Sequence, residues 1–522
     1  MGHFRGMTEI EFKILATPEA AARIADAPAL AALAEGPPET LHLRTVYHDT
    51  AEGALEAAGI ALRMRFDGQG WTQTVKTARA VQAGLSEARE SNTPMPGETP
   101  DPAAIPDAGL AARVQDALGD APLAPVFATV IARTTRRLAL PGLGRVEMAL
   151  DEGEIRAGDR AAPLTEIEFE LIEGSPRAVF EAVRRVVPAE ALTPSTCTKA
   201  DRGALLARTG AIHPEPRPRK AKRVALDPGM TGEAGARCVL AECLSQVSAN
   251  VSAVLASDDP EGPHQLRVGL RRLRSATTLF SGVLASTELK RLSREAQWLG
   301  REVGRQRDLD VTLADLVAPA AEALPGEPGF AALETALADA ADAERARLRE
   351  TLAGARARGF LLDLSEFVAC RGWLDPSDPD QTPRLARTLP ETAAAALDRR
   401  LARAAKRAKG LDRLSTEQRH ELRKELKKLR YSVEFCASLY PQKKVKPFLK
   451  RLKALQAVFG SLNDAAMAKE LLGGPDAPGG DDPAAARAAG FVLGLHTERA
   501  QHGWTEAKAL WTALRDTRPF WR

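Results

Sequence analysis

Two segments of the sequence place carboxylates side by side on one face of a predicted strand. EIEFKI (9–14) alternates charged and apolar residues, and TEIEFELI (165–172) repeats the same pattern. The charged faces carry Glu9, Glu11 and Lys13 in the first segment and Glu166, Glu168 and Glu170 in the second. A period of two predicts β-strands, and like charges that share a strand face repel each other. A divalent cation between them would relieve that repulsion, so the pattern favours a metal site.

Basic residues gather on other predicted strands. ALRMRF (61–66) places two arginines on one face, WTQTVKTA (71–78) carries a lysine, and TVIARTTRRLAL (129–140) contains further arginines. These cations are Arg63, Arg65, Lys76, Arg133 and Arg137. A solvated surface usually mixes both signs, whereas here the signs separate by strand. Such segregation is expected if the charged faces converge on one interior, and a closed barrel of about eight strands provides such a lumen.

A lumen with both signs suits a polyanion that is bound together with a metal ion. Arginine forks and lysine ammonium groups bind phosphate oxygens, and clustered carboxylates supply oxygen ligands to Mg²⁺ or Mn²⁺. The phosphate loop G-x-x-x-x-G-K-[ST] does not occur in the sequence, which excludes that mechanism at the level of motifs. His42 and His48 have no partner motif for nucleophilic catalysis.

The chain divides into two halves with different periodicities. Its 522 residues exceed what one hydrophobic core usually supports, so at least two domains are expected. Short alternating segments over 7–208 predict a mostly antiparallel β half, with helices near 18–33 and 176–187. The segment 209–222, rich in proline and basic residues, predicts a linker. From 223 to 512 a 3.6-residue periodicity predicts an all-α bundle.

The helical half contains an internal repeat. HQLRVGLRRLRSATTLF (264–280) aligns without a gap to HELRKELKKLRYSVEFC (420–436), and the same offset carries Gly304 onto Gly460. On a helix, each copy has a basic stripe beside an apolar stripe. The basic stripes comprise His264, Arg267, Arg271 and Arg274 in the first copy and His420, Arg423, Lys427 and Arg430 in the second. A repeated basic face predicts a concave surface for a polyanion, and the scarcity of aromatic residues among these cations disfavours nucleic acid.

Composition narrows the setting of the protein. Lys and Arg number 72 and Asp and Glu 69, so the net charge of +3 predicts no partner by itself. The five cysteines are an odd number without paired metal-ligand spacing, which predicts reduced thiols. No stretch approaches the roughly 20 apolar residues that span a membrane, and MGHFRG at the start lacks the apolar core of a signal peptide. We therefore expect a cytoplasmic protein without a membrane partner.

The first half resembles a known family. EIEFK matches the E-x-E-x-K signature of CYTH domains, the triphosphate tunnel metalloenzymes. An L-R-x-R strand, a lysine strand, an arginine strand, a D-x-G turn and a second E-x-E strand follow in the family's order. The resemblance implies a barrel tunnel and metal-assisted hydrolysis of a phosphoanhydride. It implies metal ligands at Glu9, Glu11, Glu147, Asp151, Glu168 and Glu170, and catalytic roles for Glu9, Glu11, Lys13 and Lys76. It also implies substrate binding by Arg63, Arg65, Arg133, Arg137 and Lys199.

The second half resembles another family. H-x-L-R-x-x-x-[RK]-[RK]-L-R occurs twice, with L-G-x-x-x-G-x-x-R-D between the copies. This is similar to the CHAD domain, a helical module associated with inorganic polyphosphate, and implies that the two basic stripes bind polyphosphate. The order of the two domains resembles that of bacterial inorganic triphosphatases. We therefore expect a multidomain α+β chain that hydrolyses inorganic triphosphate to pyrophosphate and phosphate with Mg²⁺ or Mn²⁺.

Two alternatives stay open at this point. A class IV adenylate cyclase, or a thiamine or nucleoside triphosphatase, would use the same triphosphate grip. A rival of another class is a polyphosphate-binding scaffold whose tunnel is catalytically silent. The nearly complete set of charged tunnel residues disfavours the scaffold.

Overall fold

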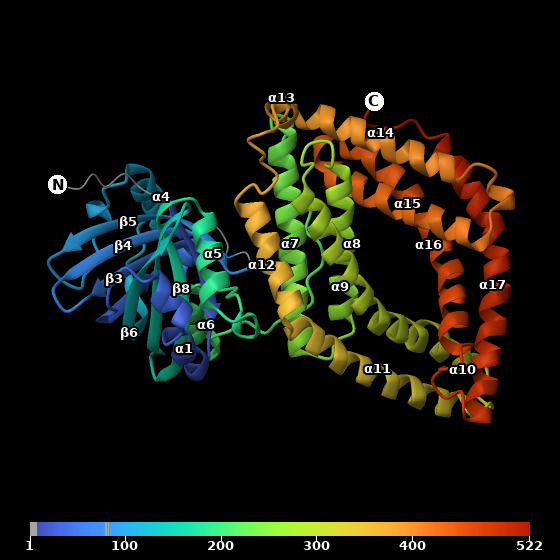
Figure 1. Cartoon of the computed structure of the whole chain (residues 1–522), viewed down its shortest axis with the longest axis horizontal. Helices are drawn as coiled ribbons and strands as arrows, with labels where there is room; N and C mark the ends of the chain where they lie inside the picture. Colours follow the sequence, from blue (N-terminus) through green and yellow to red (C-terminus); the bar gives the residue numbers. More distant parts are fainter. Residues whose placement is uncertain (1–7, 79–80, 82) are drawn as a thin grey trace. The chain divides into compact units, whose positions relative to one another are not determined.

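The computed structural model describes residues 8–78, 81 and 83–522 and divides into two compact units. The first unit contains Met1–Glu215 together with Gly354–Cys370, and the second contains Pro216–Ala353 together with Arg371–Arg522. The first unit is built on strands and the second on helices (Figure 1).

The strands of the first unit close into a single barrel. The order around the barrel is β1-β5-β4-β3-β2-β6-β7-β8, and every neighbouring pair is antiparallel. The strands are β1 (Thr8–Leu15), β2 (Glu39–Asp49), β3 (Ile60–Phe66), β4 (Trp71–Ala78), β5 (Leu85–Met95), β6 (Ala124–Leu140), β7 (Gly144–Ala157) and β8 (Arg160–Gly174). Closure removes unpaired strand edges and turns alternate residues of each strand toward one interior. The predicted antiparallel barrel is confirmed.

Two strands lie outside the predicted set. β2 (ETLHLRTVYHD) places Leu43, Thr45 and Tyr47 on one face, and β5 (LSEARESNTPM) has few apolar residues on either face. The other six strands coincide with the charged, alternating segments of the sequence, β7 with RVEMALDEGEI (145–155). β5 pairs with β1 and β4, so it is needed to close the barrel between them.

Helices cover the outside of the barrel. α1 (Pro18–Ala25), α2 (Pro28–Leu33) and α5 (Arg177–Val186) bury apolar residues in one core with β1, β6, β7 and β8. α3 (Ala54–Ala57) and α4 (Ala108–Leu118) form a smaller core against β3 and β4. α12 (Ala355–Ala369) comes from much later in the sequence, yet it belongs to this unit and contributes Leu362 to the core around α5. These layers hold the strands, and with them the charged interior, in register.

α6 (Lys199–Thr209) packs against β6, β7 and β8. Thr198 caps its first turn, and Thr198 and Asp201 form a reciprocal capping box. Gly203 lies directly against the ring of Phe127, so a Cβ at this position would overlap the ring. The helix therefore approaches the barrel closely and carries Lys199, at its first position, into the interior.

The second unit repeats a helical arrangement. α7 (Gly232–Ala256), α8 (Glu261–Leu279) and α9 (Thr287–Val311) are followed at offsets of 157, 155 and 155 residues by α14 (Leu389–Arg407), α15 (Thr416–Cys436) and α16 (Gln442–Leu472). In each set, consecutive helices pack on each other, and a further long helix packs on the third: α11 (Gly329–Ala353) on α9 and α17 (Pro483–Arg515) on α16. The remaining helices are α10 (Ala318–Ala323) and α13 (Gln381–Ala386). The predicted all-α second half is confirmed, and both motif helices, α8 and α15, occupy equivalent places.

Among the described residues, α7 is the one helix with enough length and apolar character to cross a membrane. Its most apolar window has a mean hydropathy of 1.4, and 56% of that window is buried. A buried core helix gives the same signal, so this helix is weak evidence for a membrane span.

We expect Gly203→Ala to destabilise the first unit by about 1–3 kcal/mol, the usual cost of overpacking. The added methyl group would overlap the Phe127 ring. Gly36→Ala is the matched control, because a Cβ there meets no atom within 4 Å. Chemical denaturation of both variants tests this, and equal stability would contradict the close packing of α6.

Candidate active site

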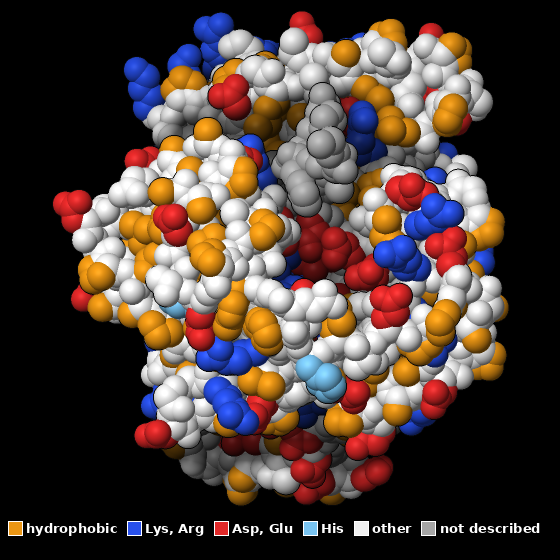
Figure 2. All heavy atoms as spheres, turned by 90° about the vertical axis from the view of Figure 1, so that its left-hand side faces the viewer, with side chains coloured by type: hydrophobic (Ala, Val, Ile, Leu, Met, Phe, Trp, Pro, Cys, Tyr) orange, Lys and Arg blue, Asp and Glu red, His pale blue; other side chains and the backbone are white. Residues whose placement is uncertain are grey.

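The interior of the barrel is a cavity of about 1500 Å³. Figure 2 views the molecule from the left-hand side of Figure 1 and shows a hollow with acidic side chains gathered inside it. Ten of the predicted site residues line the cavity, namely Glu9, Glu11, Lys13, Arg63, Arg65, Lys76, Arg133, Glu168, Glu170 and Lys199. They come from β1, β3, β4, β6, β8 and α6. Closure of the barrel thus brings together charges that lie as much as 190 residues apart.

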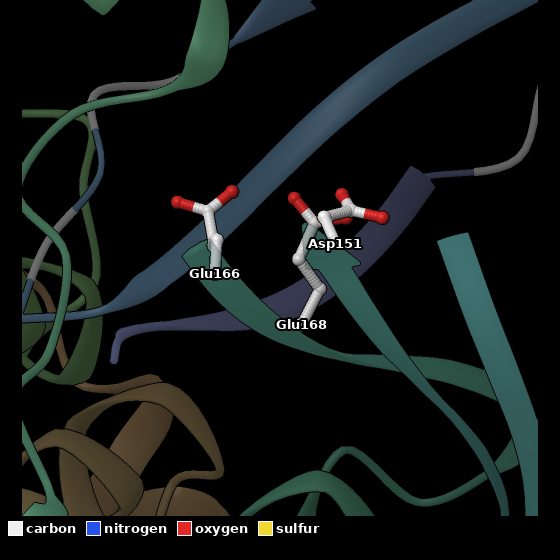
Figure 3. A group of neighbouring side chains, drawn as sticks. All are labelled: Asp151, Glu166 and Glu168. Atoms are coloured by element: carbon white, nitrogen blue, oxygen red, sulfur yellow. The ribbon is translucent and has the colours of Figure 1, made fainter. Parts of the chain in front are cut away.

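A first carboxylate cluster consists of Asp151 on β7 and Glu166 and Glu168 on β8. All three residues are buried, Asp151 and Glu166 with no exposed surface. One carboxylate oxygen from each lies within 4.8 Å of the others, a spacing that would suit a metal ion. Figure 3 shows the carboxyl groups of Asp151 and Glu168 next to each other, with Glu166 on the same strand as Glu168.

The chain's own cations already occupy the first carboxylate cluster. The Lys199 ammonium lies 2.8 Å from Asp151, 2.5 Å from Glu166 and 2.8 Å from Glu168. The Arg133 guanidinium makes hydrogen bonds of 2.7 and 2.6 Å to Asp151 and one of 2.6 Å to Glu168. Arg202 pairs with Glu166, and Lys13 pairs with Glu168. A metal ion here would have to displace Lys199, so these carboxylates are better explained as partners of the cations.

These ion pairs outweigh the cost of burial. Burial alone raises the pKa of Glu168, but Lys13, Lys199 and Arg133 hold this pKa well below its usual range. The pKa of Asp151 is lowered for the same reason, by Lys199 and Arg133 against the effect of burial. Both residues are therefore ionised, and their negative charge is compensated within the protein.

A second carboxylate cluster consists of Glu9 and Glu11 on β1, Glu90 on β5 and Glu170 on β8. Glu11 and Glu170 lie directly opposite each other in the β1–β8 ladder. The Lys76 ammonium lies 2.6 Å from Glu9, 3.0 Å from Glu90 and 3.9 Å from Glu11. Within the described part of the chain, no basic side chain lies within 4 Å of the Glu170 carboxylate. This cluster has more carboxylates than cations.

The excess negative charge shows in the proton affinities of Glu9 and Glu170, whereas Arg63 and Lys76 lower the pKa of Glu90 against the effect of burial. Burial, with Glu11, Glu90 and Glu170 nearby, raises the pKa of Glu9 to about 8 although Lys76 opposes the shift. Burial and Glu11 raise the pKa of Glu170 to about 7. A divalent cation would replace these protons and relieve the repulsion, so the oxygen donors of this cluster fit Mg²⁺ or Mn²⁺.

Arg65 shows the opposite charge imbalance, a cation without a carboxylate among the described residues to compensate it. Its Nε donates to Thr45 Oγ1 at 3.4 Å, and no carboxylate of the described residues lies within 4 Å of its guanidinium. Burial together with Arg63 and Arg133 lowers its pKa to about 10. A partly buried guanidinium repelled by two others provides a place for an anion.

The second unit brings the two predicted basic stripes together. α8 packs on α15. The ammonium group of Lys427 on α15 is repelled by Arg267 and Arg271 of α8. It is also repelled by Arg423 and Arg430 of its own helix. Burial and these arginines lower the pKa of Lys427 to about 6. His264 is part of the same surroundings, since burial and then Arg307, Arg267 and Arg271 influence its pKa, which is lowered. We call this set the helical basic cluster: His264, Arg267, Arg271, Arg423, Lys427 and Arg430.

Two family models match the chain. That of the CYTH domain matches residues 7–204, and that of the CHAD domain matches residues 238–473. The chain therefore contains a CYTH domain and a CHAD domain. An inorganic triphosphatase from Haemophilus influenzae is 32% identical over 201 residues, which are 38% of this chain and 55% of that protein. The chain therefore spans about half of the length of this curated relative.

The structure of the CHAD domain from the plant Ricinus communis resembles the helical unit. It is 28% identical, with a TM-score of 0.50, and the alignment covers 58% of this chain and 98% of that one. The likeness supports the assignment of the second half as a CHAD domain. The match to the CHAD family includes α12, although α12 packs in the first compact unit.

Some predicted residues lie away from the CYTH cavity or from the helical basic cluster. Arg137 and Glu147 face each other across β6 and β7 but do not line the cavity, and Arg137 is exposed. Arg137 follows Arg133 by four residues, a distance of roughly 13 Å along a strand. Arg274 in the CHAD domain is exposed and donates to Gln297, and His420 is exposed.

The sequence analysis missed two residues of the CYTH site. Glu90 lies on the unpredicted strand β5, where Glu90 and Asn92 share one face, and this period of two was the available signal. Arg202 follows the predicted Lys199 by three residues, so the two share one face of α6, but only the fold shows that this face meets Glu166.

Lys199→Met and Arg65→Met should have opposite effects on the stability of the metal-free CYTH domain. Removing Lys199 leaves three buried carboxylates short of a cation, and we expect a loss of about 3–5 kcal/mol. Removing Arg65 relieves repulsion by Arg63 and Arg133, so the free energy of unfolding should stay the same or rise. Urea denaturation in EDTA compares the two variants. Similar losses for both would contradict the charge balance described above.

Proposed function

We propose that the CYTH domain hydrolyses inorganic triphosphate to pyrophosphate and phosphate in a reaction that requires Mg²⁺ or Mn²⁺. The observation that carries this proposal is a single cavity with two features. It contains a cluster with more carboxylates than cations, and it contains the cation Arg65, which other cations repel. The CYTH family includes hydrolases and cyclases, and the curated relative is named an inorganic triphosphatase. These points favour triphosphate hydrolysis over a silent tunnel.

The cations would hold the phosphate chain. Arg63 and Arg65 of β3 offer planar guanidinium forks, and a fork can donate two hydrogen bonds to one phosphate. Arg133 of β6 already binds Asp151 and Glu168 through Nε and Nη2, so it would reach the phosphate through Nη1. Lys13, Lys76 and Lys199 add ammonium groups, each already fixed by carboxylates at 2.5–3.0 Å. Donors fixed in advance need little reorganisation as charge develops on the phosphate oxygens, which is the largest usual contribution to such catalysis. Arg137 is the predicted substrate ligand that this arrangement supports least.

Glu9, Glu11, Glu90 and Glu170 would hold the metal ion. When bound, Mg²⁺ or Mn²⁺ would neutralise phosphate charge and acidify a water molecule. Glu9 and Glu170 have pKa values of about 8 and about 7, so they would give up protons as the metal binds at neutral pH. Asp151 and Glu168, which the family pattern also suggests as ligands, would instead fix Lys199, Arg133 and Lys13.

The choice of substrate is tested by offering tripolyphosphate, ATP and thiamine triphosphate with Mg²⁺ or Mn²⁺ and scoring phosphate and cyclic AMP. We expect the fastest phosphate release from tripolyphosphate. Cyclic AMP from ATP would favour the cyclase, faster hydrolysis of ATP or thiamine triphosphate would favour an organic triphosphatase, and no product at all would favour the scaffold.

In the same assay, Glu170→Gln should lower activity by about 100-fold or more, the usual cost of losing one preorganised electrostatic partner. Glu170 has no cationic partner within 4 Å among the described residues, so the loss would not come from a broken ion pair. Mn²⁺ binding measured by electron paramagnetic resonance should weaken in parallel. The control is Glu173→Gln, since Glu173 is exposed and pairs with Arg145. Equal activity of the two variants would contradict the metal assignment.

We further propose that the CHAD domain binds inorganic polyphosphate at the helical basic cluster. Cations from both repeats converge there, and burial together with repulsion by the neighbouring arginines lowers the pKa of Lys427 to about 6. A chain of phosphates would supply that charge at regular intervals. Aromatic partners at the cluster are few, with Arg430 above the Tyr431 ring at 4.9 Å, so stacking on bases has little support.

Polyphosphate binding should be coupled to uptake of a proton by Lys427. Unliganded Lys427 is mostly neutral at pH 8, and a bound polyanion favours its charged form. Affinity should therefore fall as pH rises above 6, by up to about tenfold per pH unit for one linked proton. Calorimetry at pH 8 in two buffers of different ionisation enthalpy measures the uptake.

Lys427→Met should bind polyphosphate without this proton, and Lys424→Met, on an exposed position paired with Glu421, should behave like the wild type. The same proton uptake in all three proteins would contradict the role of Lys427. If Arg267→Glu together with Arg423→Glu left the affinity unchanged, the helical basic cluster would not be the polyphosphate site.

A cytoplasmic location also remains our proposal. All five cysteines are free thiols in the structure, and Cys243 and Cys436 are buried. Free thiols fit a reducing compartment.

A further inference from the structure

α12 (Ala355–Ala369) is an outlying part of the first compact unit. It lies within the sequence matched by the CHAD family, yet its Leu362 joins the core around α5 and β8 of the CYTH barrel. Arg184 of α5 donates to Asp363 at 3.0 Å and to Glu366 at 2.7 Å. An apolar contact and a charged contact therefore hold α12 on the outer side of α5.

Arg358, in the first turn of α12, binds a different part of the unit. Its guanidinium donates to the carbonyl oxygen of Glu190, to that of Leu192 at 3.2 Å and to the hydroxyl of Thr193 at 3.5 Å. One side chain thus binds three acceptors along four residues of chain. All three contacts are made by one nitrogen, Nη1, so a single amino group of the guanidinium holds this segment.

The segment that Arg358 holds, 190–195, is paired with β1 at the tunnel lysine. Leu15 N donates to Thr193 O, and Ser195 N donates to Lys13 O, both at 2.9 Å. These two bonds fix the backbone on either side of Ile14, immediately after the E-x-E-x-K motif. The opposite edge of β1 at this point pairs with β8, where Lys13 faces Glu168.

The same segment leads into α6. Ser195 is 1% exposed, and its hydroxyl accepts a hydrogen bond from Arg202 at 3.3 Å and donates one to Cys197 O at 2.8 Å. Four residues after Ser195, Lys199 begins α6 and binds all three carboxylates of the first cluster. The segment 190–195 therefore touches or adjoins three of the four cations that neutralise this cluster: Lys13, Lys199 and Arg202.

We propose that Arg358 is a positioning residue of the triphosphate tunnel: by fixing residues 190–195, it sets the places of Lys13 and Lys199 in the cavity. The proposal rests on the proposed function of the CYTH domain. Arg358 touches neither the cavity nor its charges, so it acts through the backbone of this segment. Arg358 lies 184 residues beyond Gly174, the last residue of the barrel strands.

A purely structural role, in which α12 only covers the core, makes a different prediction. The Arg184 contacts also hold α12, but they involve no residue of 190–195. Arg184→Ala is therefore a matched control that weakens the packing of α12 on α5 and leaves the Arg358 contacts in place. Arg358→Lys keeps the charge and part of the donor capacity, so it serves as a rescue variant.

The experiment uses the full chain with Arg358→Ala, Arg358→Lys and Arg184→Ala. Hydrogen–deuterium exchange should rise at Leu15 and Ser195 in Arg358→Ala, by at least about tenfold as local protection is lost. The affinity for tripolyphosphate in EDTA should fall, and kcat with Mg²⁺ should fall about tenfold, as is common when a group that orients a ligand is removed. Arg184→Ala should match the wild type in all three measurements, and Arg358→Lys should recover part of each loss.

Activity is measured well below the melting temperature, so that loss of stability alone does not lower kcat. Unchanged exchange at Leu15 and Ser195 in Arg358→Ala would overturn the proposal, as would faster exchange with unchanged affinity and kcat. Equal losses in Arg184→Ala would also overturn it, since they would show that α12 acts only by covering the core. If the wild type hydrolysed no triphosphate, the proposed function would fail, and the exchange and affinity measurements in EDTA would still decide the role of Arg358.

Discussion

A carboxylate that leaves water loses several kcal/mol of solvation unless a cation takes the place of the water. The CYTH barrel meets this constraint in two ways. In the first carboxylate cluster, Lys199 and Arg133 bridge Asp151 and Glu168, so the chain neutralises itself. In the second cluster, Glu170 has no such partner among the described residues, and protons are held instead. The chain's own cations thus compensate the first cluster, whereas the second keeps an excess of carboxylates, which is why we propose the metal site there.

The same reasoning applies with the sign reversed to the buried cations. Arg65 in the barrel and Lys427 in the CHAD domain both have lowered pKa values, and in both cases burial and neighbouring arginines are the cause. Among the described residues, no carboxylate lies within 4 Å of the Arg65 guanidinium or the Lys427 ammonium, although Arg267 of the helical basic cluster pairs with Asp308 at 2.6 Å. An anion with several negative charges would compensate these cations, and this is the common basis of the two ligand proposals.

The sequence predicted those strands in which charged and apolar residues alternate with a period of two. β1, β3, β4, β6, β7 and β8 were predictable because charged and apolar residues alternate along them, and the barrel followed from the separation of signs. β2 and β5 were missed, since β5 has too few apolar residues to reveal a buried face, and Glu90 was missed with it. The pairing of Lys199 with the first carboxylate cluster, and of α8 with α15, depends on contacts between distant segments that no local pattern encodes.

The path of the chain has a consequence for cleavage by proteases. Residues 211–218 have no regular secondary structure and connect the barrel to the helices, so this stretch offers the extended backbone that proteases prefer. A cut there severs only one of three covalent crossings between the compact units, because the chain enters the first unit again at Gly354 and leaves it after Cys370. The barrel would still be attached through α12, by its apolar and charged contacts with α5. A single nick should therefore produce two fragments on a denaturing gel that migrate as one particle in native solution.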